Sequence, residues 1–151
     1  MTGNAEVSLP NSDSRQVPTL SKLTILLKPS VGSWINYKFG DDLHIGIFDG
    51  ENRVISFLPE GLISECQSHW PEFLTILELT KVKNLDLYNF CKKNKSKFCY
   101  FTYDDSHNNC FDFVIEFCNT IFEWNYNKEE FSRKFILFPL KNYLNNFINY
   151  F

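Results

Sequence analysis

The stretch from Asp104 to Phe122, DDSHNNCFDFVIEFCNTIF, decides the fold. Its first six residues are polar and suit a turn that caps a following helix. From Cys110 onward apolar side chains occur on every helical face, and Cys110, Val114 and Phe117 share one row. The pattern predicts a central helix over residues 110–122 that is buried nearly all round.

The chain on either side of this helix supplies the other elements of an α+β domain. An apolar, β-branched run at residues 23–27 predicts a strand, and residues 43–48 and 53–57 flank a glycine-containing turn as in a hairpin. Further strands are predicted at 73–79, where a helix is the alternative, and at 98–103; residues 64–71 are expected to be irregular. Helices are predicted at 84–94 and from residue 129 onward. The expected architecture is an antiparallel sheet packed on the central helix.

Length and composition indicate one domain. With 151 residues, 44% of them hydrophobic, the chain suffices for a single core. Residues 1–20 are polar, lack the pattern of a secretory signal and are expected to be a disordered leader, which leaves residues 21–151 as the domain. No window of about 18 uninterrupted apolar residues exists, so a membrane-spanning helix is not expected.

Charge and cysteine usage narrow the function classes. The formal net charge of -3 and the scattered basic residues argue against nucleic-acid binding, and the lysines between 92 and 97 are interpreted as a solvated face. Five cysteines without a C-x-x-C pair favour a reducing compartment, cytoplasmic or nuclear, over a disulfide framework or zinc site. A metal site built from His44, His107 and Cys110 is disfavoured because these residues lie in different elements. No cofactor is therefore expected.

Cys110 is the leading candidate for chemistry. A cysteine in the first turn of a helix lies near unpaired amides, which favour the thiolate and stabilise an oxyanion. Acyl transfer also needs a base, and His44 and His107 are the candidates. His44 shares a strand face with Gly46, which leaves space beside it. The alternative interpretation is a cysteine buried as a small core residue, with each histidine in a structural role.

These residues also carry a resemblance to a known superfamily. The strand motif H-x-G-I at residues 44–47, a glycine-containing turn, and a much later N-C at residues 109–110 resemble the circularly permuted papain-like proteins. That superfamily includes NlpC/P60-like, lecithin:retinol acyltransferase-like and PPPDE-like groups. Within it the chain resembles the makorin-2 opposite-strand protein family over residues 22–151, through LLKP (26–29), DLHIGI (42–47), YDDSHNNC (103–110) and EFSRKF (130–135).

The resemblance implies a permuted papain-like fold in which Cys110 is the nucleophile and His44 the base. It places Ser56, on the second hairpin strand, where acyltransferase-like relatives carry a histidine that orients the imidazole. Serine stabilises an imidazolium poorly, and Asp42 is the alternative third member. One hypothesis is thus a cysteine hydrolase acting on an amide, isopeptide or thioester.

The other hypothesis is an inactive papain-like scaffold that serves as a protein-interaction module. Its groove would be lined by Trp34, Trp70, Trp124 or the last, phenylalanine-rich helix. In either case the partner or substrate is expected to be a protein or peptide.

Overall fold

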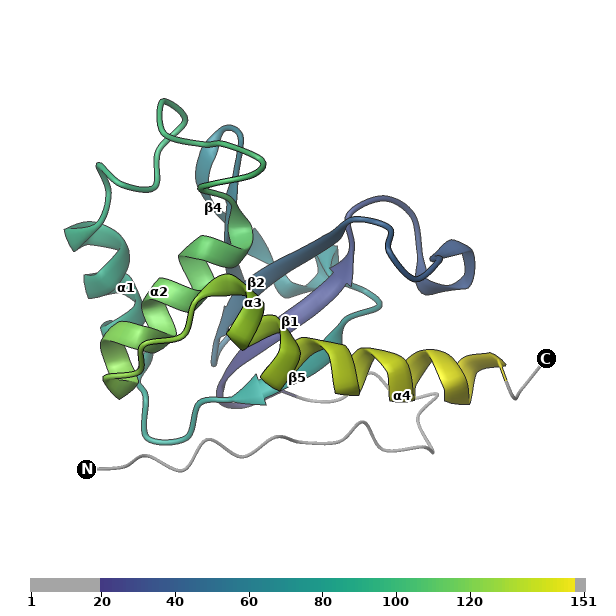
Figure 1. Cartoon of the computed structure of the whole chain (residues 1–151). Helices are drawn as coiled ribbons and strands as arrows, with labels where there is room; N and C mark the ends of the chain where they lie inside the picture. Colours follow the sequence, from purple (N-terminus) through teal and green to yellow (C-terminus); the bar gives the residue numbers. More distant parts are fainter. Residues whose placement is uncertain (1–19, 149–151) are drawn as a thin grey trace.

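A computed structural model of the chain describes residues 20–148. These residues form an α+β domain, as predicted (Figure 1). The expected disordered leader, except for its last residue, lies outside the described part. Five strands form an antiparallel sheet in the order β4-β3-β2-β1-β5. They are β1 (Leu23–Pro29), β2 (Leu43–Asp49), β3 (Arg53–Leu58), β4 (Gly61–Cys66) and β5 (Leu74–Glu78).

The central ladders are unequal in length, and this shapes the sheet near His44. β1 and β2 pair along seven residues, from Leu23 opposite Asp49 to Pro29 opposite Leu43. β2 and β3 pair only at Ile47 with Ile55 and at Phe48 with Val54. The hairpin predicted at 43–57 is therefore confirmed, but its two strands diverge toward the start of β2.

β4 was not predicted, because residues 64–71 were expected to be irregular. The first part of that region continues a second hairpin in which Arg53 pairs with Cys66 and Leu58 with Gly61. Arg53 also binds Ser64, donating from Nε to the hydroxyl at 3.0 Å. Tertiary pairing thus makes a strand of a sequence that is too polar to suggest one.

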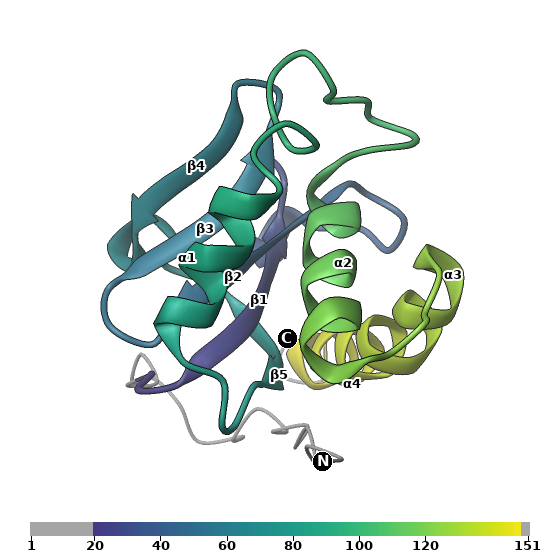
Figure 2. The same ribbon diagram turned by 90° about the vertical axis from the view of Figure 1, so that its left-hand side faces the viewer.

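The helices all pack on one face of the sheet, as Figure 2 shows for α1 and α2. Their bounds are α1 (Asn84–Lys93), α2 (Cys110–Phe122), α3 (Lys128–Phe131) and α4 (Leu137–Ile148). A π-helical stretch at Ser132–Ile136 joins α3 to α4. We call this side of the sheet the helix-covered face; its buried residues in β1, β2 and β3 are Leu23, Ile25, Leu27, Ile45, Ile47, Ile55 and Phe57.

α2 begins and ends with well-defined caps. The Asn109 side-chain oxygen accepts a hydrogen bond from the Phe111 amide at 3.0 Å, and the Asp112 carboxylate accepts one from the Asn109 amide at 2.8 Å. At the other end, Glu123 adopts a left-handed conformation with φ 55°. These caps fix the position of Cys110 in the first turn, as the polar run before it predicted.

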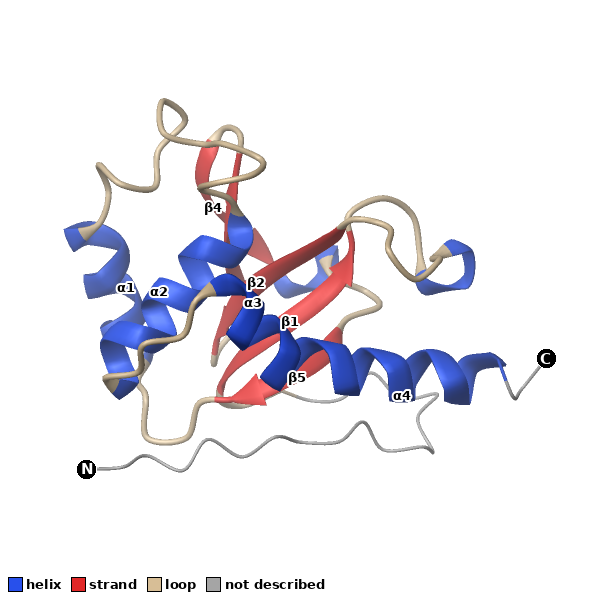
Figure 3. Ribbon diagram, in the orientation of Figure 1, coloured by secondary structure: helices blue, strands red, loops and turns tan. Residues whose placement is uncertain are grey.

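The strand predicted at 98–103 is wrong, because the chain between α1 and α2 forms turns (Figure 3). Phe98 is buried, with ring centroids 5.3 Å from Phe57 and 5.4 Å from Phe113. The Thr102 hydroxyl donates to the Lys97 carbonyl at 2.6 Å and closes the loop. Of the aromatic residues that suggested a strand, Phe98 is buried in the core, whereas Tyr100 and Phe101 are exposed to solvent.

The opposite side of the sheet, which we call the far face, carries a smaller apolar cluster. Leu26, Phe48 and Val54 project from the strands and pack against Trp70, which follows β4 and a short 3₁₀ turn. Because side chains alternate along a strand, these residues point away from the helices. The central strands are therefore buried on both faces.

Within residues 20–148, no helix is both long enough and apolar enough to cross a bilayer.

Candidate functional site

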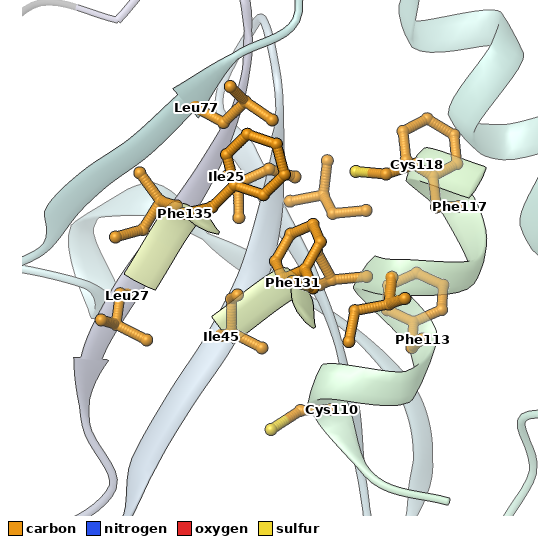
Figure 4. Close-up of a cluster of buried hydrophobic side chains, with 14 of the residues drawn as sticks. Ile25, Leu27, Ile45, Leu77, Cys110, Phe113, Phe117, Cys118, Phe131 and Phe135 are labelled. Carbon is orange, nitrogen blue, oxygen red and sulfur yellow. The ribbon is translucent and has the colours of Figure 1, made fainter. Parts of the chain in front are cut away.

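Cys110 lies on the helix-covered face, at the edge of the main core. Figure 4 shows its side chain in the first turn of α2, with the sulfur directed toward the strand that carries Ile45. The residue is only 7% exposed. The backbone amides of Ile45, Phe111 and Cys110 itself act to lower the pKa of the thiol. Ile45 lies in the part of β2 beyond the short ladder with β3.

Burial nevertheless dominates the electrostatics of this thiol. Loss of solvent raises the pKa of Cys110, and the three backbone amides only partly offset that effect. The nearby Asp112 carboxylate raises the pKa further. The helix-start position, which was expected to favour a thiolate, therefore leaves Cys110 as a neutral thiol at neutral pH.

His44 lies on the far face and contacts Ser56, as the resemblance implied. Its Nε2 is 3.1 Å from the Ser56 hydroxyl oxygen, and both residues are buried. Burial lowers the pKa of His44 to about 4, and the positive charge of Lys28 acts in the same direction, while Glu65 opposes it. The imidazole is therefore neutral at physiological pH.

Trp70 occupies the space that Gly46 leaves beside His44. The His44 and Trp70 rings have centroids 5.2 Å apart. A Cβ atom at position 46 would lie 3.0 Å from the indole Cη2 and 2.9 Å from Val54 Cγ1. The indole N–H donates to Glu65 at 3.3 Å, and the Lys28 ammonium lies 4.4 Å from the ring centroid. The expected opening next to His44 is thus filled by a side chain of the protein itself.

The structure does not bring Cys110 and His44 together. Ile45 packs with Cys110 in the main core, whereas His44, its neighbour in sequence, packs against Trp70 on the other side of the sheet. Adjacent strand residues point to opposite faces, so the sheet itself separates the thiol from the imidazole. The arrangement therefore contains a buried His44–Ser56 pair and a separate buried thiol.

The remaining candidate residues lie in loops. His107 is exposed in the turn before α2, where its Nδ1 is 3.1 Å from an Asp104 carboxylate oxygen. Asp42 is exposed, and its backbone carbonyl accepts a hydrogen bond from the Ser30 amide at 3.0 Å. His69, given little weight from the sequence, is 3.7 Å from Glu65. Neither His107 nor Asp42 joins the His44–Ser56 pair.

The tryptophans expected to line a groove are part of the packed interior. Trp34 is 2% exposed and Trp70 is fully buried. Trp124 is half-buried, with ring centroids 4.6 Å from Phe122 and 5.5 Å from Phe135. Their large apolar area is used for folding, which corrects the expectation of an aromatic groove at these positions.

Sequence reasoning missed three neighbours of His44: Lys28, Glu65 and Trp70. The available signal for Lys28 was the strand pairing, since it lies directly opposite His44 across the β1–β2 ladder. The contact of Trp70 with His44 could not be predicted from local sequence, because the segment after β4 reaches His44 only by folding back over the far face.

Family membership follows from a match that covers nearly the whole chain. A family model described as DUF4796 C-terminal matches residues 5–150. The chain belongs to this family. Neither the curated proteins nor the solved structures contain a match to it. The matched region includes both the Cys110 thiol and the His44–Ser56 pair.

Proposed function

We propose that this member of the DUF4796 C-terminal family is a non-catalytic protein-interaction module, built on a scaffold related to the circularly permuted papain-like proteins. The separation of Cys110 from His44 by the sheet supports a non-catalytic role, because general-base activation needs the two groups within hydrogen-bond reach. The scaffold is that of the makorin-2 opposite-strand protein family, which the chain resembles over residues 22–151.

The observation that carries the interaction role is an exposed apolar surface next to α4. Nine large hydrophobic side chains are exposed among the described residues, and five of them lie in the β1–β2 loop or at the start of α4. We call this set the apolar patch; it comprises Val31, Ile35, Phe39, Leu137 and Phe138. Concentrated exposed apolar area is typical of protein contact sites.

The loop and the helix of the apolar patch lie against each other. The Lys141 ammonium is 5.8 Å from the centroid of the Phe39 ring, which joins the loop to the first turns of α4. The Trp34 and Tyr143 rings make a second contact between the same segments, with centroids 5.2 Å apart. The two elements that carry the patch residues are therefore in contact with each other.

One buried anchor and one exposed hydrogen bond hold the loop in position. Trp34 is inserted in the core and donates from its indole N–H to the Glu72 carbonyl at 2.8 Å. The Asp41 carboxylate accepts a hydrogen bond from the Lys38 amide at 2.9 Å. A preorganised loop loses little conformational entropy on binding, so Ile35 and Phe39 are suited to act as apolar anchors for a protein partner.

Site-specific photo-crosslinking tests the proposal. A photoreactive residue at position 35 in the full chain, expressed in cells, should form a discrete protein adduct that mass spectrometry identifies. The purified partner should then bind wild type and Cys110→Ala equally, and should bind Phe39→Ser with Phe138→Ser at least tenfold more weakly, since two apolar anchors are lost. Tyr100→Ser with Phe101→Ser is the matched control, because it removes two exposed aromatic residues elsewhere and should bind normally. Equal binding by the patch variant, or loss in the control, would refute the proposal.

A cysteine hydrolase is the second candidate, and one observation favours it. The backbone amides of Ile45, Phe111 and Cys110 itself lower the pKa of the Cys110 thiol, as the nucleophile of such an enzyme requires. Such an enzyme would need the far face to rearrange so that His44 crosses to Cys110. An activity-based acyl probe that labels Cys110 in wild type, but not in His44→Ala, would support the hydrolase and overturn the non-catalytic assignment.

A further inference from the structure

A hollow of about 480 Å³ opens at the end of the sheet where β1 begins, away from both Cys110 and the apolar patch. The turn between β2 and β3 forms one wall, and the connection from β5 to α1 forms another. Its volume lies within the usual range for small-molecule sites. The proposed interaction role does not use this hollow.

Three lysines line the hollow. Lys22 precedes β1, while Lys81 and Lys83 belong to the connection between β5 and α1. Within residues 20–148, none of their ammonium groups forms an ion pair, whereas Lys97 and Lys128 elsewhere are paired with Glu116 and Asp112. Unpaired positive charge therefore collects here on a chain whose formal net charge is -3.

The two carboxylates in the lining are already hydrogen-bonded to other groups. Asp49 accepts from the Tyr88 hydroxyl at 2.6 Å and, through its other oxygen, from backbone amides of the β2–β3 turn at 2.9 to 3.1 Å. Glu51 accepts from the Asn84 side-chain amide at 2.9 Å. Both carboxylates keep their negative charge, but neither forms an ion pair with Lys22, Lys81 or Lys83. The three ammonium groups therefore outnumber the carboxylates of the lining and are not engaged by them.

The backbone at the rim is formed by a turn and the start of a helix. Lys81 has φ 68°, a left-handed conformation that turns the chain between β5 and α1. Asn84, the first residue of α1, also lines the hollow. The Asp86 carboxylate in the first turn of α1 accepts a hydrogen bond from the Lys83 amide at 2.9 Å, so the Lys83 side chain and not this helix start is the group that can meet an anion.

We propose that this hollow binds a phosphate-bearing anion through the ammonium groups of Lys22, Lys81 and Lys83. Lysine is a common phosphate ligand because its compact charge approaches the oxygens from several directions. The same chemistry suits a soluble phosphorylated metabolite and the headgroup of a phosphoinositide lipid.

An NMR titration of the ¹⁵N-labelled full chain with inorganic pyrophosphate, at constant ionic strength, tests the site. The amides of Gly50, Lys81 and Asn84 should shift along a saturable curve. Lys81→Gln with Lys83→Gln should weaken the affinity at least tenfold. Lys92→Gln with Lys93→Gln is the matched control, because it removes the same charge from the other end of α1 and should change the affinity less than twofold.

Each outcome decides the proposal. A native-like spectrum for both double variants shows that folding is unaffected, and Lys22→Gln alone provides a milder variant if the first pair unfolds. Absence of saturation up to about 10 mM, well above the usual range for metabolite sites, would overturn the proposal. Equal weakening in the control pair would also overturn it, because binding would then follow net charge rather than the hollow.

Vesicle flotation then separates the two sources of phosphate. Retention on phosphatidylcholine vesicles containing a phosphoinositide, lost in the Lys81 and Lys83 pair and absent with phosphatidylcholine alone, assigns the site to a lipid headgroup. Saturable pyrophosphate binding without flotation assigns it to a soluble phosphorylated ligand.

Discussion

Substituting Gly46 by alanine tests the packing that separates His44 from Cys110. The added Cβ would lie 2.9 Å from Val54 Cγ1, 3.0 Å from Trp70 Cη2 and 3.1 Å from the Ile55 carbonyl oxygen. Distances this short require displacement of the neighbours, and the Ile55 oxygen belongs to the β3 backbone. Overpacking of a core by one methyl group costs about 1–3 kcal/mol. Alanine regains roughly 0.5–1 kcal/mol through reduced chain entropy, so a net loss of about 1–2 kcal/mol is expected.

Urea unfolding of Gly46→Ala, followed by far-UV circular dichroism, measures this loss directly. Thr120→Ala, at an exposed position of α2, is the control and should stay within about 0.5 kcal/mol of wild type. Combining Gly46→Ala with Trp70→Phe removes the clashing indole atom. The double variant should therefore lose less stability than the two single variants lose together. An unchanged free energy of unfolding for Gly46→Ala would refute the packing of Trp70 against Gly46. A double variant whose loss equals the sum of the single losses would refute it too.

Three further outcomes are expected. The folded-state pKa of His44 is about 4, below its ordinary 6.5, so the unfolded chain binds the proton first as the pH falls. Stability present above pH 6.5 should therefore decrease by about 3 kcal/mol on acidification to pH 4, and His44→Gln should remove that part of the pH dependence in denaturant titrations. Iodoacetamide should label Cys99 faster than Cys110, since the Thr102 hydroxyl lowers the pKa of Cys99 while burial raises that of Cys110; a Cys110 rate that depends on His44→Ala would contradict the separation of the two groups. Asn109→Ala should cost about 1–2 kcal/mol in thermal unfolding, because the cap of α2 is lost, and an unchanged midpoint would show that Asn109 does not cap the helix.

The secondary structure near the candidate residues was largely predictable from local pattern. The polar run before Cys110 placed the start of α2 correctly, because capping is decided by residues adjacent in sequence. The resemblance placed Ser56 across the hairpin from His44, and the two side chains are in contact. β4 and the turns at 98–103 could not be obtained in this way, since cross-strand pairing and packing of Phe98 determine them.

Whether Cys110 and His44 lie on the same side of the sheet depends on which face α2 covers. β2 presents Ile45 and Ile47 on one face and His44 with Gly46 on the other, and α2 packs on the more apolar side. Burial of apolar area favours that choice, but residue types known to form a catalytic pair suggested the reverse. The identity of Trp70 as the residue that fills the Gly46 position depends on a long-range contact, for which no local pattern exists.

The π-helical stretch at Ser132–Ile136 makes the C-terminal region sensitive to its length. Each residue of an α-helix turns the chain by about 100°, and a π turn holds one residue more than an α turn. That extra residue lets Phe131 of α3 and Leu140 of α4 both face the core. Deleting one residue from the stretch would give an uninterrupted helix whose second half is rotated about the axis, so that Phe39 would lose its contact with Lys141. Natural variation in chain length is therefore expected on either side of this stretch and not within it.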